Sequence, residues 1–127
     1  MSQELPLDEI AAAACEAVIG KVDRTQVSRL LEVLEGAKDV NVVLAFLAKQ
    51  TGRGQWNRRA ATRLFKILRE SRDIEEARAI LGIFRWLYEA AGKDKDRGRK
   101  IAALQKLRLS DPAPKNFYYN YIYTCLK

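Results

Sequence analysis

The sequence predicts an all-α fold, a compact bundle of about five to seven short helices. Apolar residues recur three and four positions apart along almost the whole chain, which is the spacing of one face of a helix. The interruptions fall at Gly, Asp and Pro, the residues that cap or end helices. With 127 residues, 48% of them hydrophobic, the chain can bury one core. We therefore expect a single helical domain over residues 1–127.

The first two helices are indicated by the residues at their ends. Residues 7–19 form an alanine-rich segment that is followed by Gly20, a residue common just after a helix. The second segment carries Val and Leu on one face and reaches Gly36. Either Asp23 or Thr25 can cap its beginning, because both side chains can accept a hydrogen bond from a free backbone N–H group.

The third helix is expected to follow Asp39. It contains the apolar stretch "VVLAFLA" and ends at "TGRG". A helix that is apolar on all sides is typically surrounded by others, so we expect this one at the buried centre of the bundle. Its β-branched valines also favour a strand, but a lone strand would have no partner in this chain.

Residues 53–70, "RGQWNRRAATRLFKILRE", predict a strongly amphipathic fourth helix. On a helical wheel the apolar side chains fill one half, so we expect Trp56 and Phe65 in the core. The basic side chains fill the other half and are expected to face outward; they are Arg58, Arg59, Arg63, Lys66 and Arg69.

The remaining elements follow the same logic. Residues 73–91 predict a largely buried fifth helix, which ends the core (about residues 7–92). The charged, Gly-bracketed segment "GKDKDRGRK", residues 92–100, is expected to be a linker to a C-terminal helical extension, residues 100–127. A sixth helix over about residues 100–109 is stopped by the prolines of "SDPAPKN".

The tail "FYYNYIYTCLK" has two competing interpretations. Its aromatic residues alternate as they would in a strand, whereas Phe117, Tyr121 and Cys125 share one face of a helix. We favour the helix, because no other segment offers a sheet. The exposed tyrosines of such a helix are more typical of packing or oligomerisation than of base stacking.

Positive charge is concentrated in two regions of the chain. Lys and Arg total 23 against 16 Asp and Glu, which gives a net charge of +7. Residues 21–69 hold eleven basic and four acidic residues, and residues 93–127 hold nine and three. A surplus of this kind favours polyanionic partners.

The fourth helix also places like charges one turn apart, for example Arg59 and Arg63, which costs folding free energy. A phosphate backbone bound there would offset this repulsion. A solvated helix face is the competing interpretation. A membrane surface is disfavoured, because Trp56 and Phe65 are expected in the core.

Several chemistries lack their usual residues. The chain has no histidine, the commonest general base and metal ligand. Cys15 and Cys125 lie far apart without Cys-x-x-Cys spacing, and "TGRG" lacks the Gly-Lys-Ser/Thr ending of a phosphate loop. We therefore expect a protein that is not an enzyme and holds no metal or cofactor. The acidic start "MSQELPLDEI" and the absence of a run of about 18 apolar residues predict a cytoplasmic protein.

Three short segments, in order, have counterparts in one family. "VDRTQVSR" at residues 22–29 is similar to a Thr-Thr-Ser/Thr-Gln-Ile-Arg stretch, and "LAFLAKQTGR" at residues 44–53 to Leu-Ala-Tyr-x-x-Ala-Arg-Gln. "IFRWLYEAAG" at residues 83–92 is similar to an aromatic helix ending in Glu-Ala. In these the chain resembles the Csm-type small subunit of type III-A CRISPR interference complexes, with the Cmr-type small subunit of type III-B as the near alternative. Two motif arginines are replaced, by Ser28 and Lys49.

The resemblance implies a non-catalytic subunit that stacks along a filament of larger subunits and lines the channel where guide RNA pairs with target RNA. Its contacts would be sequence-independent, because the guide reads the sequence. The expected RNA-binding residues are Arg24, Gln26, Arg29, Lys49, Arg53, Arg58, Arg59, Arg63 and Lys66. Gln26 would either contact a sugar or cap its helix.

Two other functions fit the composition. A protein–protein adaptor would use the basic face for an acidic partner and the tyrosine tail to form oligomers. A basic helical DNA-binding protein is the third interpretation, although no helix-turn-helix spacing supports it.

Overall fold

The computed structural model describes residues 4–92 and 94–127, with side chains except at residues 94–96. The described part of the chain is all-α, as the sequence predicts. The first three residues of the acidic start and residue 93 of the expected linker lie outside it. The helices are α1 (Leu7–Ile19), α2 (Arg24–Ala37), α3 (Val40–Gly52), α4 (Arg58–Arg69), α5 (Ile74–Glu89), α6 (Asp94–Gln105) and α7 (Phe117–Leu126).

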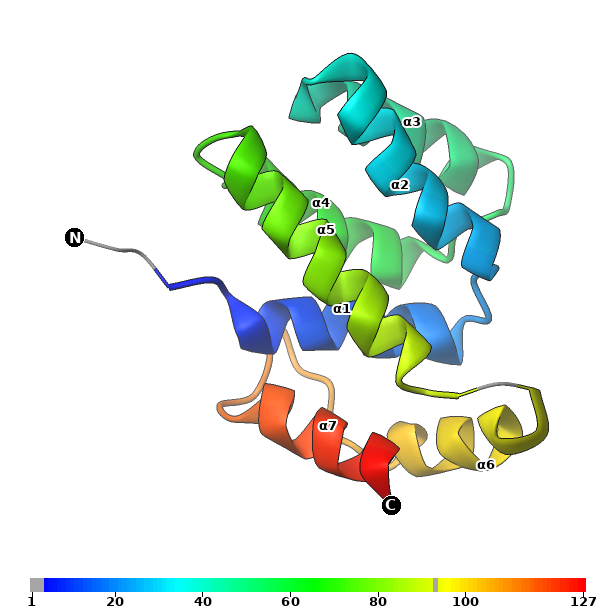
Figure 1. The fold of residues 1–127 in the computed structure, drawn as a ribbon. Helices are drawn as coiled ribbons and strands as arrows, with labels where there is room; N and C mark the ends of the chain where they lie inside the picture. The colour runs from blue at the N-terminus through cyan, green and yellow to red at the C-terminus, as the bar shows by residue number, and fades with distance from the viewer. Residues whose placement is uncertain (1–3, 93) are drawn as a thin grey trace.

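Helix α1 crosses the middle of the molecule (Figure 1). Helices α4 and α5 pack on one side of it, and α6 and α7 pack on the other. The α2–α3 hairpin forms an outer layer, in which α3 contacts α4 and α2 contacts α5. Every residue from Ile10 to Val18 is buried, because the alanines of α1 allow helices to approach closely on all sides.

The expectation that the third helix is the buried centre is therefore wrong. Helix α3 buries only Val43, Leu47 and Gln50 among its residues, and Val42 is 44% exposed. High hydropathy alone did not distinguish a helix covered on all sides from one in the outer layer. The difference lies in side-chain size, since α1 consists largely of small residues and α3 of larger ones.

The helix starts follow the caps that the sequence indicates. Asp23 caps α2 by accepting a hydrogen bond from the N–H of Thr25, at 3.1 Å. Asp39 caps α3 through the N–H of Asn41, at 2.9 Å, and Asp73 caps α5 through the N–H of Glu76, at 2.8 Å.

The expected charged linker is mostly helix, and this part of the prediction is wrong. Helix α6 begins at Asp94 and ends at Gln105, earlier than the predicted helix over residues 100–109. Lys100 and Leu104, one turn apart, lie on its buried side. The ammonium of Lys100 donates to the carbonyls of Cys125, at 2.5 Å, and Lys127, at 2.8 Å, and so closes the end of α7.

The tail is helical, as predicted. Phe117, Tyr121 and Cys125 are buried on one side of α7, and the Tyr121 hydroxyl donates to the carbonyl of Leu87 at 2.5 Å. Burial raises the pKa of the Tyr121 hydroxyl well above its usual value and raises the pKa of the Cys15 thiol, on the facing helix α1, to about 12. Both groups stay protonated at neutral pH, so they serve packing.

Candidate nucleic-acid interface

Helix α4 is anchored by its apolar face. Trp56, just before the helix, is 2% exposed and stacks on Phe84 with 6.0 Å between ring centroids. Phe65, which the sequence places in the core, is 41% exposed and lies under Arg69 with 5.9 Å between the guanidinium carbon and the ring centroid. The packing of Trp56 on Phe84 therefore fixes α4 in an orientation that leaves Phe65 outside the core.

Arg63 does not face outward, which corrects its place among the expected RNA contacts. Its side chain is only 10% exposed and lies between α4 and α1. There it forms ion pairs with Glu16, at 3.5 Å, and Glu9, at 3.7 Å, and it donates to the Ser110 carbonyl at 2.7 Å. A buried cation requires such partners, and these leave Arg63 no exposed surface for a nucleic acid.

The like charges of α4 are offset in part within the protein itself, so their repulsion does not require the bound phosphate backbone that the sequence suggested. Arg59 pairs with Glu16 at 3.3 Å, and Lys66 pairs with Asp111 at 3.1 Å. The Lys66 ammonium lowers the pKa of Asp111, which keeps that carboxylate charged. Carboxylates of this chain thus neutralise much of the repulsion, and the crowding of arginines is no evidence for RNA.

A small pocket of about 250 Å³ runs along this side of α4. Its walls come from α4, from Glu16 of α1 and from Asp111 of the loop before α7. Arg63 forms part of the lining, but its Nη1 is buried and pairs with Glu9 at 3.7 Å. Arg58 and Arg59 also line the pocket and are exposed, so a phosphate oxygen at this place would meet the donors of these two arginines.

Gln26 is buried and has a structural role, which neither expectation for it foresaw. Its side-chain oxygen accepts a hydrogen bond from the Gln50 amide at 2.9 Å, and both residues are under 8% exposed. Asp23, not Gln26, caps α2. The bond instead ties the first half of α2 to the last half of α3 and satisfies two amides that would otherwise be costly to bury.

Five of the expected residues belong to segments that lie at one end of the molecule. The start of α2, the end of α3 and the start of α4 lie together there (Figure 1, right). Gly54, with a φ of 81° that favours glycine, turns the chain between α3 and α4. We call the exposed cations of these neighbouring segments the basic edge; they are Arg29, Lys49, Arg53, Arg58 and Arg59.

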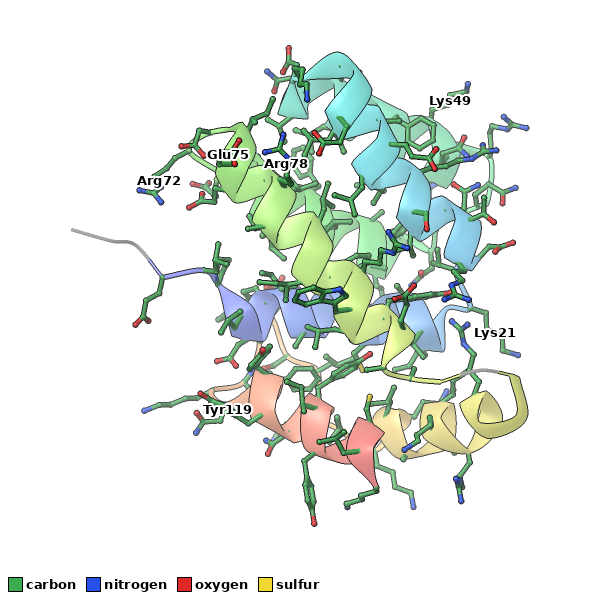
Figure 2. All side chains as sticks on the ribbon, in the orientation of Figure 1. Lys21, Lys49, Arg72, Glu75, Arg78 and Tyr119 are labelled. Atoms are coloured by element: carbon green, nitrogen blue, oxygen red, sulfur yellow. The ribbon has the colours of Figure 1, made fainter. Side chains whose placement is uncertain are left out.

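Four cations of the basic edge are free of carboxylates. Arg29, Lys49, Arg53 and Arg58 are exposed, and within the described residues their side chains have no ion pair or hydrogen bond. Figure 2 shows Lys49 directed away from the helices. Arg59 is also exposed but shares Glu16 with Arg63.

The other expected contacts lie beside the basic edge. Arg24 is exposed but pairs with Glu89 of α5 at 3.2 Å. Lys66 lies two turns further along α4 and is held by Asp111. From the second basic region, Lys100 is buried, whereas Lys106, Arg108 and Lys115 are exposed.

Sequence reasoning missed the carboxylates that organise α4. Glu16 is only 5% exposed, and its carboxyl group forms ion pairs with Arg59 and Arg63. The available signal was its position as the only charged residue in the apolar run from Ile10 to Val18, since a buried acid is almost always paired. Asp111 gave no comparable signal, because it lies in a loop.

Comparison with known proteins finds no matching family model, no similar curated protein and no similar solved structure. Within the described residues, no helix is both long and apolar enough to span a membrane, and no group of three or more His, Cys, Asp and Glu side chains could hold a metal ion.

Proposed function

We propose that this protein is a non-catalytic RNA-binding subunit of a type III CRISPR effector complex, which contacts the phosphates of guide and target RNA without reading their sequence. The observation that carries RNA binding is the basic edge, where Arg29, Lys49, Arg53 and Arg58 are exposed and unpaired. Arginine is suited to this task because its planar guanidinium can bind phosphate through two hydrogen bonds. The resemblance of three ordered segments supports the assignment to the CRISPR complex.

The four unpaired cations set the size of the expected effect. Each phosphate contact to single-stranded RNA contributes about 0.7 to the slope of log affinity against log salt, so four contacts give a slope of about 3. Affinity should then fall about fifty-fold between about 50 and about 200 mM salt. The isolated chain should bind weakly, because one small patch releases few counterions.

The experiment compares two triple variants with the same loss of charge. In the first, Arg29, Arg53 and Arg58 are changed to Gln; in the second, Lys106, Arg108 and Lys115 are changed to Gln. Fluorescence anisotropy with single-stranded RNAs of unrelated sequence should show a slope lower by about 2 for the first triple only. Equal losses in the two triples would mean that net charge alone attracts RNA, and the basic edge would not be the site.

Purification from the native host tests the finer assignment. The tagged protein should co-purify with a guide RNA and with larger CRISPR subunits. Capture of protein partners without RNA would instead favour the adaptor. One observation supports that second candidate: Tyr119, Tyr123 and Leu126 form an outward stripe on α7 and are each at least 65% exposed.

A further inference from the structure

A second, larger cleft lies apart from the basic edge. It has a volume of about 730 Å³ and opens between the α1–α2 turn, the end of α5 and the first turns of α6. Clefts of this size hold small-molecule ligands in many proteins. Its lining combines an aromatic ring, glycines that leave the backbone accessible, and charged side chains from three elements.

The carboxylates of this cleft already have partners. Glu89 accepts from Arg24, at 3.2 Å, and from Arg85, at 3.4 Å. Asp23 accepts the N–H of Thr25 in the cap of α2. These acids are therefore engaged within the fold, and among the described lining side chains the cations without an ion pair are those of Lys21 and Arg97.

Arg97 brings an unsatisfied donor into the cleft. Its guanidinium carbon lies 4.7 Å from the ring centroid of Tyr88, and the Tyr88 hydroxyl donates to the Val22 carbonyl, so the ring is fixed. The Nη2 of Arg97 is buried and has no hydrogen-bond partner in the described structure. A buried N–H group without an acceptor is costly and rare, and a small rotation of the guanidinium toward the cleft would let an anionic oxygen satisfy it.

Lys21 supplies a second cation to the lining. It occupies the α1–α2 turn with a φ of 57°, is exposed, and has no ion pair within the described residues. Figure 2 shows its side chain extending from this turn, above α6. The turn is held in place, because the Val22 N–H donates to the Ala17 carbonyl at 3.0 Å.

We propose that this cleft binds a phosphomonoester, with Arg97 and Lys21 as its contacts. Two cations match the dianion that a phosphomonoester forms near neutral pH, and the guanidinium fork matches its oxygens. The group can belong to a free mononucleotide or to the 5′ end of an RNA. The site shares no residue with the basic edge and does not depend on RNA binding there.

The experiment is a ¹H–¹⁵N NMR titration with adenosine 5′-monophosphate, inorganic phosphate and adenosine. The first two should cause saturable shifts of amides in the α1–α2 turn, the end of α5 and α6, whereas adenosine should not. Arg97→Gln and Lys21→Gln should each weaken binding by about ten-fold, because each removes a charge-assisted contact. Lys106→Gln, the same charge change outside the cleft, should bind as the wild type does.

Two results would overturn the proposal: adenosine monophosphate that shifts no amide of the cleft, or equal affinities of Lys21→Gln and Lys106→Gln. Lys21 is exposed, so its variant keeps the test valid even if Arg97→Gln unfolds.

Matched RNAs with a 5′-phosphate and with a 5′-hydroxyl identify the source of the phosphate group. Cleft shifts with the 5′-phosphorylated RNA alone assign the site to an RNA end, and cleft shifts with neither RNA assign it to a free nucleotide.

Discussion

The two faces of residues 53–70 carry the same kinds of residue in opposite surroundings. Trp56 and Phe65 are both aromatic, but Trp56 is buried against Phe84 and Phe65 is 41% exposed. Arg58 and Arg63 are both arginines, but Arg63 is enclosed by carboxylates, whereas Arg58 is exposed and pairs with none of the described side chains. Residue type alone therefore does not separate the structural side chains of this segment from those available to a ligand.

The aromatic pair should show the largest difference in stability. Trp56→Ala removes a fully packed indole and leaves a cavity beside Phe84, so the free energy of unfolding should fall by about 3–5 kcal/mol. Phe65→Ala should cost less than about 1.5 kcal/mol, because much of the ring is already in water. Urea denaturation of both variants measures the two values, and similar losses would contradict the asymmetry.

The arginine pair should differ by somewhat less. Arg63→Met leaves the buried Glu16 with the exposed Arg59 as its partner among the described residues, so stability should fall by about 3 kcal/mol. Arg58→Met should stay within about 0.5 kcal/mol of the wild type, because the Arg58 side chain has no ion pair or hydrogen bond in the described part of the chain.

A second substitution separates the charge effect from lost packing. In the Arg63→Met background, Glu16→Gln removes the buried carboxylate that has lost Arg63, and it should restore part of the lost stability. If it restores none, the loss comes from packing of the arginine stem, and the ion pair with Glu16 is not what makes Arg63 structural.

How far the sequence predicted these outcomes depends on the element. The sequence predicted the helix starts at Asp23, Asp39 and Asp73, because each cap is a hydrogen bond to a backbone N–H only two or three residues further along. The charged segment of residues 92–100, most of which lies in α6, could not be recognised as a helix, since a solvated helix and a linker have similar compositions. The position of α1 at the centre required knowing how helices assemble, which no single segment encodes.

The site was predicted in part, and helical geometry explains which part. On α4 the buried residues form an arc, and Arg63 lies about 80° from its centre, while Phe65 lies about 120° away. Residue type suggested the opposite, with Phe65 in the core and Arg63 at the surface. Arg29, Lys49, Arg53 and Arg58 needed only an exposed position, and all four have one. Gln26 could not be assigned, because its partner Gln50 lies on another helix.

Paired and unpaired cations should also differ in RNA binding. Arg58→Gln removes a free cation and should make the slope of log affinity against log salt shallower by about 0.7. Asp111→Asn releases Lys66 from its ion pair and should make the slope steeper by about the same amount. Fluorescence anisotropy at several salt concentrations measures both.

The double variant of Asp111→Asn with Lys66→Gln is the control for this prediction. It should return the slope to the wild-type value, because the released cation is gone. A slope that stays steep in the double variant would mean that the loss of the Asp111 charge acts on RNA at long range, and not through Lys66.

The smallest effect is expected from a partly exposed ion pair between α2 and α5. Glu35 of α2 accepts two hydrogen bonds from Arg78 of α5, both at 2.8 Å, and Figure 2 shows Arg78 beside Glu75 at the start of α5. The Arg78 guanidinium lowers the pKa of Glu35 to about 2. Because the folded pKa lies below the unfolded value of about 4.3, the stabilisation is complete above that value and is lost as the pH falls toward the folded pKa.

Glu35→Gln should therefore lower stability slightly near neutral pH, and the difference from the wild type should shrink as the pH falls. Urea midpoints of both proteins between about pH 6 and about pH 3 measure the difference. Solvent screening keeps it small, in contrast to the buried pair of Arg63 and Glu16. A difference that stays constant over this range would mean that Glu35 acts through packing and not through its charge.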